Sequence, residues 1–256
     1  EMGVDSCQLV CWDRPTLQDD AMAEAINKGL EKYGIHATAF WCGWEGRRVW
    51  DFYEGQLTLG LIPSDYRVER LKMLMEGSDF AKKIHVTDLA THVGYMPENP
   101  YDPKYEEVLV ACKAIVEKCK ENRQNFLFET GQETPVTLKR AIQDIEKAVG
   151  KGNVGINLDP ANLIMYGKAN PVDALEVFGE YVMGIHGKDG KYPTDGHHLG
   201  DEVPLGQGKV NYSAFIAKLK EIGYQGDITI EREISGEEQK KDIRMAKELL
   251  DKLIAE

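Results

Sequence analysis

Short apolar segments alternate with longer amphipathic segments along this chain. Continuous apolar runs bounded by glycine, proline or polar residues are typical of buried parallel strands. These runs predict seven strands, at residues 5–11, 37–42, 85–92, 125–129, 154–158, 182–186 and 227–231. Between them apolar residues recur at helical spacing, and the longest such stripe contains Val108, Cys112, Ile115, Val116 and Cys119. Strands that alternate with helices predict an α/β fold built on a parallel sheet.

Several of the predicted helices begin with a recognisable cap. Thr134 and Asn170 are each followed by proline, which suits the first position of a helix because its missing N–H would have no partner there. Ser235 and Glu238 have the spacing of a capping box, which predicts that the last helix begins at this point.

The length of 256 residues suits one α/β barrel, which typically needs about 250 residues. A barrel of eight strands needs one more strand than the pattern supplies. The chain opens on EMGVDSCQL, which resembles the end of a helix, a glycine stop and then a strand. We therefore predict a single (β/α)8 TIM barrel domain over residues 1–256, with its first strand missing from this chain and preceding residue 1.

Composition narrows the possible partners. The net charge of -12 argues against nucleic acid or an anionic membrane as the main partner, and no apolar stretch is long enough to span a bilayer. The five cysteines are an odd number and include no CxxC pair. They favour a reducing compartment over a disulfide framework, so we expect a cytoplasmic protein.

Four of the predicted strands end in a side chain that can bind a metal. The segments FLFETG, GINLDP, MGIHGKDG and DITIERE place Glu129, Asp159, His186 and Glu231 at successive strand ends, 30, 27 and 45 positions apart. The first two intervals each fit one strand and one helix, and the third adds a long loop. Barrels build their active sites at the carboxyl ends of their strands, so we expect these four side chains to converge.

Three carboxylates and one imidazole form a hard donor set, which suits Mn2+, Mg2+ or Co2+ better than a thiolate-preferring ion. Such a cation can bind two neighbouring oxygens of a sugar and acidify the intervening C–H. Glu129 and Glu231 are the candidate acid/base pair that removes and returns this proton through an enediolate. A single acidic residue at a strand end is often only a helix cap, but four metal-binding side chains at barrel spacing favour an active site. Glu133 and Glu233 are nearby alternatives to Glu129 and Glu231 in this role.

The segments THVGYMP, FETGQET, INLDPANL, GIHGKDG and TIEREISG resemble the xylose isomerase-like barrel superfamily of sugar and sugar-phosphate isomerases and epimerases. The superfamily also includes inosose dehydratases, hydroxypyruvate isomerases and endonuclease IV, and the resemblance runs from about residue 85 to the C-terminus. It implies that Glu129, Asp159, His186 and Glu231 hold one divalent metal ion, Mn2+ by preference, with Mg2+, Co2+ or Zn2+ as alternatives. Asn162 stands where several relatives have histidine, which disfavours a multi-metal endonuclease site and leaves Asn162 as a substrate contact.

Aromatic and histidine side chains are candidates for substrate binding. His92 closes a predicted strand and could bind a sugar hydroxyl or simply form part of the wall. Trp41 and Trp44 lie in an aromatic segment that follows another strand, where they could stack on a sugar ring. The same segment could instead pack on the barrel or on a second subunit of a homo-oligomer.

Lys188 and Asp189 follow His186 in an HxKD pattern that relatives share, and each could bind substrate or form a loop salt bridge. The loop at 188–209 is long enough to suggest function, and His198 within it could contact a polyol or remain solvated.

The sequence therefore predicts a metal-dependent epimerase or isomerase acting on a small sugar or sugar phosphate. The alternatives are a keto-sugar or inosose dehydratase or lyase on the same metal site, an endonuclease IV-like enzyme, and a non-catalytic sugar-binding barrel. The endonuclease is disfavoured by the acidic charge, and retention of all four metal-ligand candidates argues against the binding protein.

Overall fold

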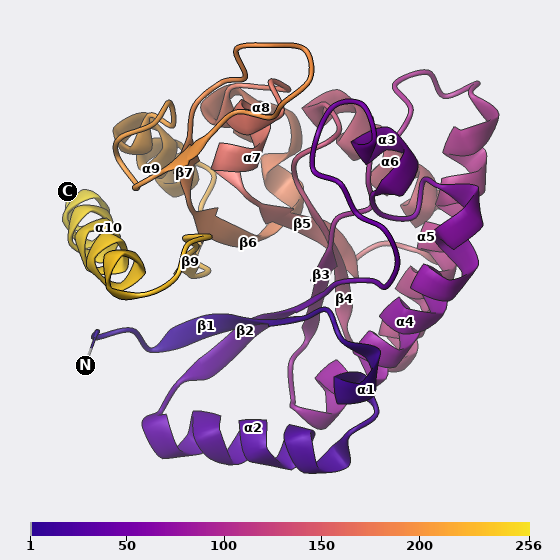
Figure 1. The fold of residues 1–256 in the computed structure, drawn as a ribbon, viewed down its shortest axis with the longest axis horizontal. Coiled ribbons are helices and arrows are strands. Elements are labelled where there is room, and N and C mark those ends of the chain that lie inside the picture. The colour runs from indigo at the N-terminus through magenta and orange to yellow at the C-terminus, as the bar shows by residue number, and fades with distance from the viewer. Residues whose placement is uncertain (1) are drawn as a thin grey trace.

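A parallel sheet of seven strands forms the centre of the computed structural model, which describes residues 2–256. Hydrogen-bonded neighbours follow the order β1-β2-β3-β4-β5-β6-β9. The bounds of these strands are Ser6–Cys11, His36–Cys42, Asp88–Thr91, Asn125–Glu129, Val154–Leu158, Val182–Gly187 and Ile228–Ile230. The sheet curls into a nearly closed barrel, with the helices around its outside (Figure 1). The predicted TIM barrel fold is confirmed.

The helices follow the strands in alternation. They are α1 (Arg14–Leu17), α2 (Asp20–Tyr33), α3 (Gly55–Thr58), α4 (Ser64–Lys83), α5 (Pro103–Glu121), α6 (Pro135–Val149), α7 (Pro160–Met165), α8 (Pro171–Phe178), the 3-10 turn η1 (Gly179–Tyr181), α9 (Tyr212–Glu221) and α10 (Glu237–Ala255). The helix starts predicted at Thr134 and Asn170 are confirmed. The capping box predicted at Ser235 is wrong, because α10 begins after Gly236 and, within residues 2–256, has no side-chain cap.

Strands β1 and β9 are the two edges of the curled sheet, and within residues 2–256 they form no ladder with each other. Side chains of β2 nonetheless reach across to β9 and to the residue just before it. His36 Nε2 lies 2.7 Å from Asp227 Oδ2, and Thr38 Oγ1 lies 3.5 Å from Thr229 Oγ1. Residues 2–5 have no regular secondary structure, and Glu1 lies outside the described residues. The strand expected before residue 1 stays a prediction.

Successive side chains of β4 point alternately to the helix layer and to the inside of the barrel. Phe126 and Phe128 on β4 belong to the large apolar core shared with the helices. Leu127 lies between them in the sequence and belongs to a smaller cluster that includes Trp41 and Trp44. Because side chains two residues apart in a strand point the same way, Glu129 shares the face of Leu127. The fold thus directs the last residue of β4 into the barrel.

The segment predicted as a loop at 188–209 contains a two-stranded antiparallel ladder, β7 (Asp189–Gly190) with β8 (Glu202–Val203). It contacts the aromatic segment that follows β2 and contains Trp44, Trp50 and Phe52. The His197 carbonyl accepts a hydrogen bond from the Phe52 backbone N–H at 3.0 Å. Among residues 2–256, no helix is both long and apolar enough to cross a bilayer.

Candidate metal and substrate site

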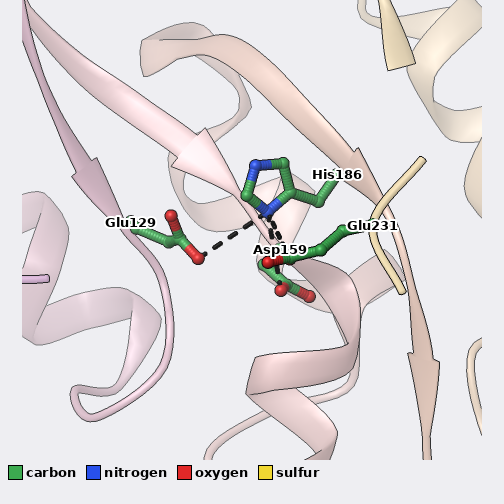
Figure 2. A group of neighbouring side chains, drawn as sticks. All are labelled: Glu129, Asp159, His186 and Glu231. Carbon is green, nitrogen blue, oxygen red and sulfur yellow. Dashed lines mark ion pairs between the residues drawn. The ribbon is translucent and has the colours of Figure 1, made fainter. Parts of the chain in front are cut away.

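The four predicted metal ligands converge at the carboxyl ends of their strands. Glu129 ends β4, Asp159 follows β5, His186 lies near the end of β6, and Glu231 follows β9. One possible ligand atom from each lies within 4.8 Å of the others, and Figure 2 shows all four side chains turned toward one another. They meet because parallel strands of one barrel end at the same rim.

The helix that follows β5 holds Asp159 in place. Pro160 begins α7, and Asp159 caps it by accepting the Asn162 backbone N–H on Oδ1 at 3.0 Å. Thr130 Oγ1 accepts the Asp159 backbone N–H at 2.9 Å. Asp159 Oδ2 is buried and accepts no hydrogen bond among residues 2–256. His186 Nδ1 and Lys188 Nζ each lie 3.6 Å from it, close enough for charge attraction but too far for a hydrogen bond. A buried carboxylate oxygen without a hydrogen bond is costly, and a bound cation would give it a direct partner.

His186 presents one ring nitrogen to the carboxylates and the other to a glutamine. Its Nδ1 lies 3.6 Å from oxygens of Glu129 and Asp159 and 3.0 Å from Glu231. Its Nε2 lies 2.8 Å from Gln8 Oε1, which can only accept, and 3.1 Å from Asn157 Nδ2, which can only donate. Burial would lower the pKa of His186, but the surrounding carboxylates outweigh it and raise that pKa well above its usual range, so without a metal Nδ1 also carries a proton. A bound metal would replace that proton on Nδ1, while Nε2 keeps its hydrogen bond to Gln8. The donor set fits a hard divalent ion.

Sequence reasoning missed Gln8, which lies on β1 at the base of the site. Its side chain donates to Asn157 Oδ1 at 3.0 Å and accepts from Asn157 Nδ2 at 3.2 Å. Gln8 therefore connects β1 to β5 and β6 beneath the four-ligand cluster. A single polar residue inside the apolar run SCQLVC was the signal that could have revealed it.

Lys188 is a buried ammonium beside the same carboxylates. Its side chain is 3% exposed, and Nζ lies 3.2 Å from Glu231, 3.6 Å from Asp159 and 3.3 Å from Glu233. His186 and Lys188 are two residues apart on an extended segment, so both side chains point into the barrel.

The two glutamates of the cluster have opposite pKa shifts. Burial raises the pKa of Glu129 to about 8, and the neighbouring carboxylates act in the same direction. Burial would also raise the pKa of Glu231, but the Lys188 ammonium and His186 outweigh it and hold that pKa well below its usual range. Two carboxyl groups whose pKa values are pushed apart are suited to opposite acid and base roles.

A cavity of about 560 Å3 opens over the cluster, which is a size suited to a small molecule. Both polar and apolar side chains line it. The polar lining is Gln8, His92, Glu129, Asn162, His186, Lys188, Thr229, Glu231, Arg232, Glu233 and Gln239. The apolar and aromatic lining includes Trp12, Trp41, Trp50, Met165, Tyr166, Leu199 and Ile243. The structure thus places four of the predicted substrate contacts at the cavity: His92, Trp41, Asn162 and Lys188.

His92 and Trp41 both touch Glu129. His92 Nε2 lies 3.5 Å from Glu129 Oε1, and the Trp41 indole N–H donates to Glu129 Oε2. Burial lowers the pKa of His92 to about 4, so its ring is neutral at pH 7 and can donate or accept a hydrogen bond. The Trp41 indole holds the Glu129 carboxyl in one orientation.

The other predicted contacts lie outside the lining of the cavity. Trp44 is 1% exposed and packs behind Trp41. Asp189 faces away from the cavity because it alternates with Lys188, and it accepts backbone N–H groups of the following loop at 2.9–3.0 Å. The His198 side chain is 73% exposed and pairs with Asp195 at 3.1 Å. Asp189 orders the loop, and His198 lies on its outer surface.

Glu133 and Glu233, the alternatives to Glu129 and Glu231, both lie outside the four-ligand cluster. Glu133 is buried outside the lining of the cavity, and burial raises its pKa to about 8. Glu233 lines the cavity with a side chain that is 62% exposed, and its ion pair at the cluster is with Lys188 at 3.3 Å.

Comparison with known proteins identifies relatives of this fold. The sequence pattern of the xylose isomerase-like TIM barrel matches residues 1–253. The xylose isomerase domain protein from Planctomyces limnophilus is 35% identical, with a TM-score of 0.92 over 98% of this chain and 89% of that one. A D-tagatose 3-epimerase-like protein is 20% identical, with a TM-score of 0.74 over 98% and 88%. Structures of other sugar epimerases and of a probable 3-DHS dehydratase share the fold at lower identity.

Uncharacterized protein MJ1311 of Methanocaldococcus jannaschii is 29% identical over 176 residues. This match covers 64% of the present chain but only 56% of the relative's length.

Proposed function

Because the chain belongs to the xylose isomerase-like TIM barrel family, we propose that it is a divalent-metal-dependent epimerase or isomerase of a small sugar. The observation that carries the proposal is the convergence of three carboxylates and one imidazole nitrogen beneath a cavity of about 560 Å3. Asp159 Oδ2 and His186 Nδ1 are buried and have no hydrogen-bond partner among residues 2–256, which supports a cation at their centre. The sugar epimerases that share this fold support the substrate class.

Glu129, Asp159, His186 and Glu231 would hold the cation, with Mn2+ as our first choice and Mg2+ or Co2+ as alternatives. When bound, the metal polarises the substrate carbonyl and makes the neighbouring C–H more acidic. A metal-binding site of this kind is also compatible with a lyase, which would expel a leaving group from the same enediolate.

The protein's own residues move the proton. Glu129 and Glu231 come from β4 and β9, which are separated by β5 and β6 in the sheet, so they reach the cavity from different directions. One carboxylate removes the proton from one face of the substrate, and the other carboxyl returns a proton to the opposite face and inverts the carbon. Trp41 orients Glu129, and neutral His92 binds a substrate hydroxyl. The aromatic wall excludes water from this step.

The charges around the cavity favour a sugar without phosphate. The two Lys and Arg side chains that line it are already paired, Lys188 with three carboxylates and Arg232 with Glu202 and Asp242. Barrels often bind phosphate at the loops after their last strands and at a nearby helix N-terminus. Here that loop bears Glu233 and the first turn of α10 is acidic. A phosphate dianion would meet negative charge instead of free donors.

The proposal is tested by proton exchange in D2O. The protein is loaded with Mg2+ and incubated with a panel of ketoses and inososes, each ketose also as its terminal phosphate, and the products are read by NMR. We expect deuterium at the carbon beside the carbonyl, formation of an epimer or isomer, and a preference for the unphosphorylated member of each pair. Loss of water or of another leaving group would establish the lyase alternative. Intact transfer of hydrogen without solvent exchange would contradict the two-glutamate mechanism.

A pair of variants separates the proposed acid/base carboxyl of Glu129 from a merely buried carboxyl. Glu129→Gln removes the ionisable group, so this side chain can neither take nor return the proton, and exchange should fall about 10²- to 10⁴-fold. Glu133→Gln is the matched control, since Glu133 is equally buried but lies outside the lining of the cavity. Circular dichroism should show both variants folded. Equal exchange rates in the two variants would contradict the acid/base role of Glu129.

A further inference from the structure

Lys188 occupies an unusual place for a lysine, in the carboxylate cluster itself. Its side chain is 97% buried, and its ammonium lies within 3.6 Å of three carboxylates. Two of these, Asp159 and Glu231, are proposed metal ligands, and Nζ is 3.2 Å from the oxygen of Glu231 that also lies 3.0 Å from His186 Nδ1. A lysine ammonium and a divalent cation would therefore attract the same oxygens.

Counting formal charges explains why both can be present. When they bind a metal, Glu129, Asp159 and Glu231 would all be ionised, and a divalent cation would leave one of their three negative charges uncompensated. A buried uncompensated charge is strongly unfavourable. Lys188 supplies the missing positive charge. Arg232, the other Lys or Arg side chain lining the cavity, is paired with Glu202 and Asp242, so among residues 2–256 the cavity offers no second candidate.

We propose that Lys188 is a resident counter-charge that sets the affinity of the metal site. With the metal bound, its ammonium balances the third carboxylate and repels the cation, which keeps the cation exchangeable. Without the metal, it holds Asp159 and Glu231 together in place of the cation. This inference rests on the proposed function, because the cation site is part of that function.

Isothermal titration calorimetry with Mg2+ and Mn2+ tests the proposal without any substrate. Lys188→Met removes the charge and keeps an unbranched side chain of similar length. We expect it to bind both ions at least about tenfold more tightly, because a like charge close to the ion has been removed. Lys188→Arg keeps the charge and should stay within about threefold of the natural protein. Lys240→Met is the control for net charge, since Lys240 is exposed on α10.

Thermal unfolding gives a second readout. Because the ammonium repels the bound cation, the Tm gain on adding about 10 mM Mg2+ should be larger in Lys188→Met than in the natural protein. A variant that folds only with the metal would support the proposal. A variant that stays unfolded with the metal present would overturn it.

The outcomes separate this inference from the proposed function. If the natural protein binds neither ion, the metal site fails and the counter-charge role fails with it. If the natural protein binds Mg2+ or Mn2+ and Lys188→Met binds it equally or more weakly, only the counter-charge role is overturned. Equal affinities of Lys188→Met and Lys188→Arg would overturn it as well, because they would show that the charge does not matter.

Discussion

Arg70 is the side chain whose loss we expect to cost the most stability outside the site. It lies on α4, is 1% exposed, and has no carboxylate partner among residues 2–256. Its guanidinium instead donates to backbone carbonyls of the segment that carries Trp44 and Trp50. Those acceptors are Thr58 and Gly60 at 2.7 Å, Arg47 at 2.8 Å and Glu45 at 3.3 Å.

The magnitude follows from these bonds. The two bonds to Thr58 and Gly60 are fully buried, so Arg70→Met leaves both carbonyls without a donor. Bonds to a charged group contribute about 1.5–3 kcal/mol each, and burying the methionine offsets part of the loss. We expect the free energy of unfolding to fall by about 4 kcal/mol, which corresponds to a Tm decrease of roughly 8–16 °C for a chain of this length. Arg70→Lys should lose about half as much, since one ammonium cannot span four carbonyls.

Urea unfolding followed by circular dichroism measures this loss, and tryptophan fluorescence reports on the segment itself because Arg70 stacks near Trp44. Lys72→Met on the same helix is the matched control. Its ammonium is exposed and, within residues 2–256, pairs only with Glu69, so its effect should stay within about 0.5 kcal/mol. If Arg70→Met fell within about 1 kcal/mol of the natural protein, the reasoning from buried carbonyls would be refuted.

Two further predictions concern the site. Gln8→Leu removes the hydrogen-bond acceptor that fixes His186, so Mg2+ affinity measured by calorimetry should fall about 10- to 100-fold. Gln8→Glu keeps an acceptor and should retain most of the affinity. Unchanged affinity in Gln8→Leu would contradict the role of Gln8 in holding His186. In metal-free protein the folded pKa of His92, about 4, lies below its unfolded value of 6.5, so the unfolded chain binds more protons between these pH values. Stability should therefore fall as pH decreases from 6.5 toward 4, by about 3 kcal/mol more than in His92→Gln, and parallel curves for the two proteins would disprove the shift.

The sequence determined the barrel and the rim on which its ligands lie. Apolar runs with helical segments between them were enough to place the seven strands, because burial on both faces leaves a continuous apolar signature. Glu129, Asp159, His186 and Glu231 could be found as a group because the carboxyl ends of parallel strands must share one rim. The capping box at Ser235 failed because such local signals compete with the path of the loop before the helix.

Only the tertiary structure decided which neighbouring side chains join those four. Gln8 meets Asn157, 149 positions away, because the curl of the sheet brings β1 opposite β5, and no local pattern encodes that contact. Lys188 and Asp189 are adjacent in the sequence, yet the pleat of the strand turns one into the carboxylate cluster and the other into the loop. A sequence shows which groups stand at the ends of strands, whereas the curvature and register of the curled sheet determine which of them meet.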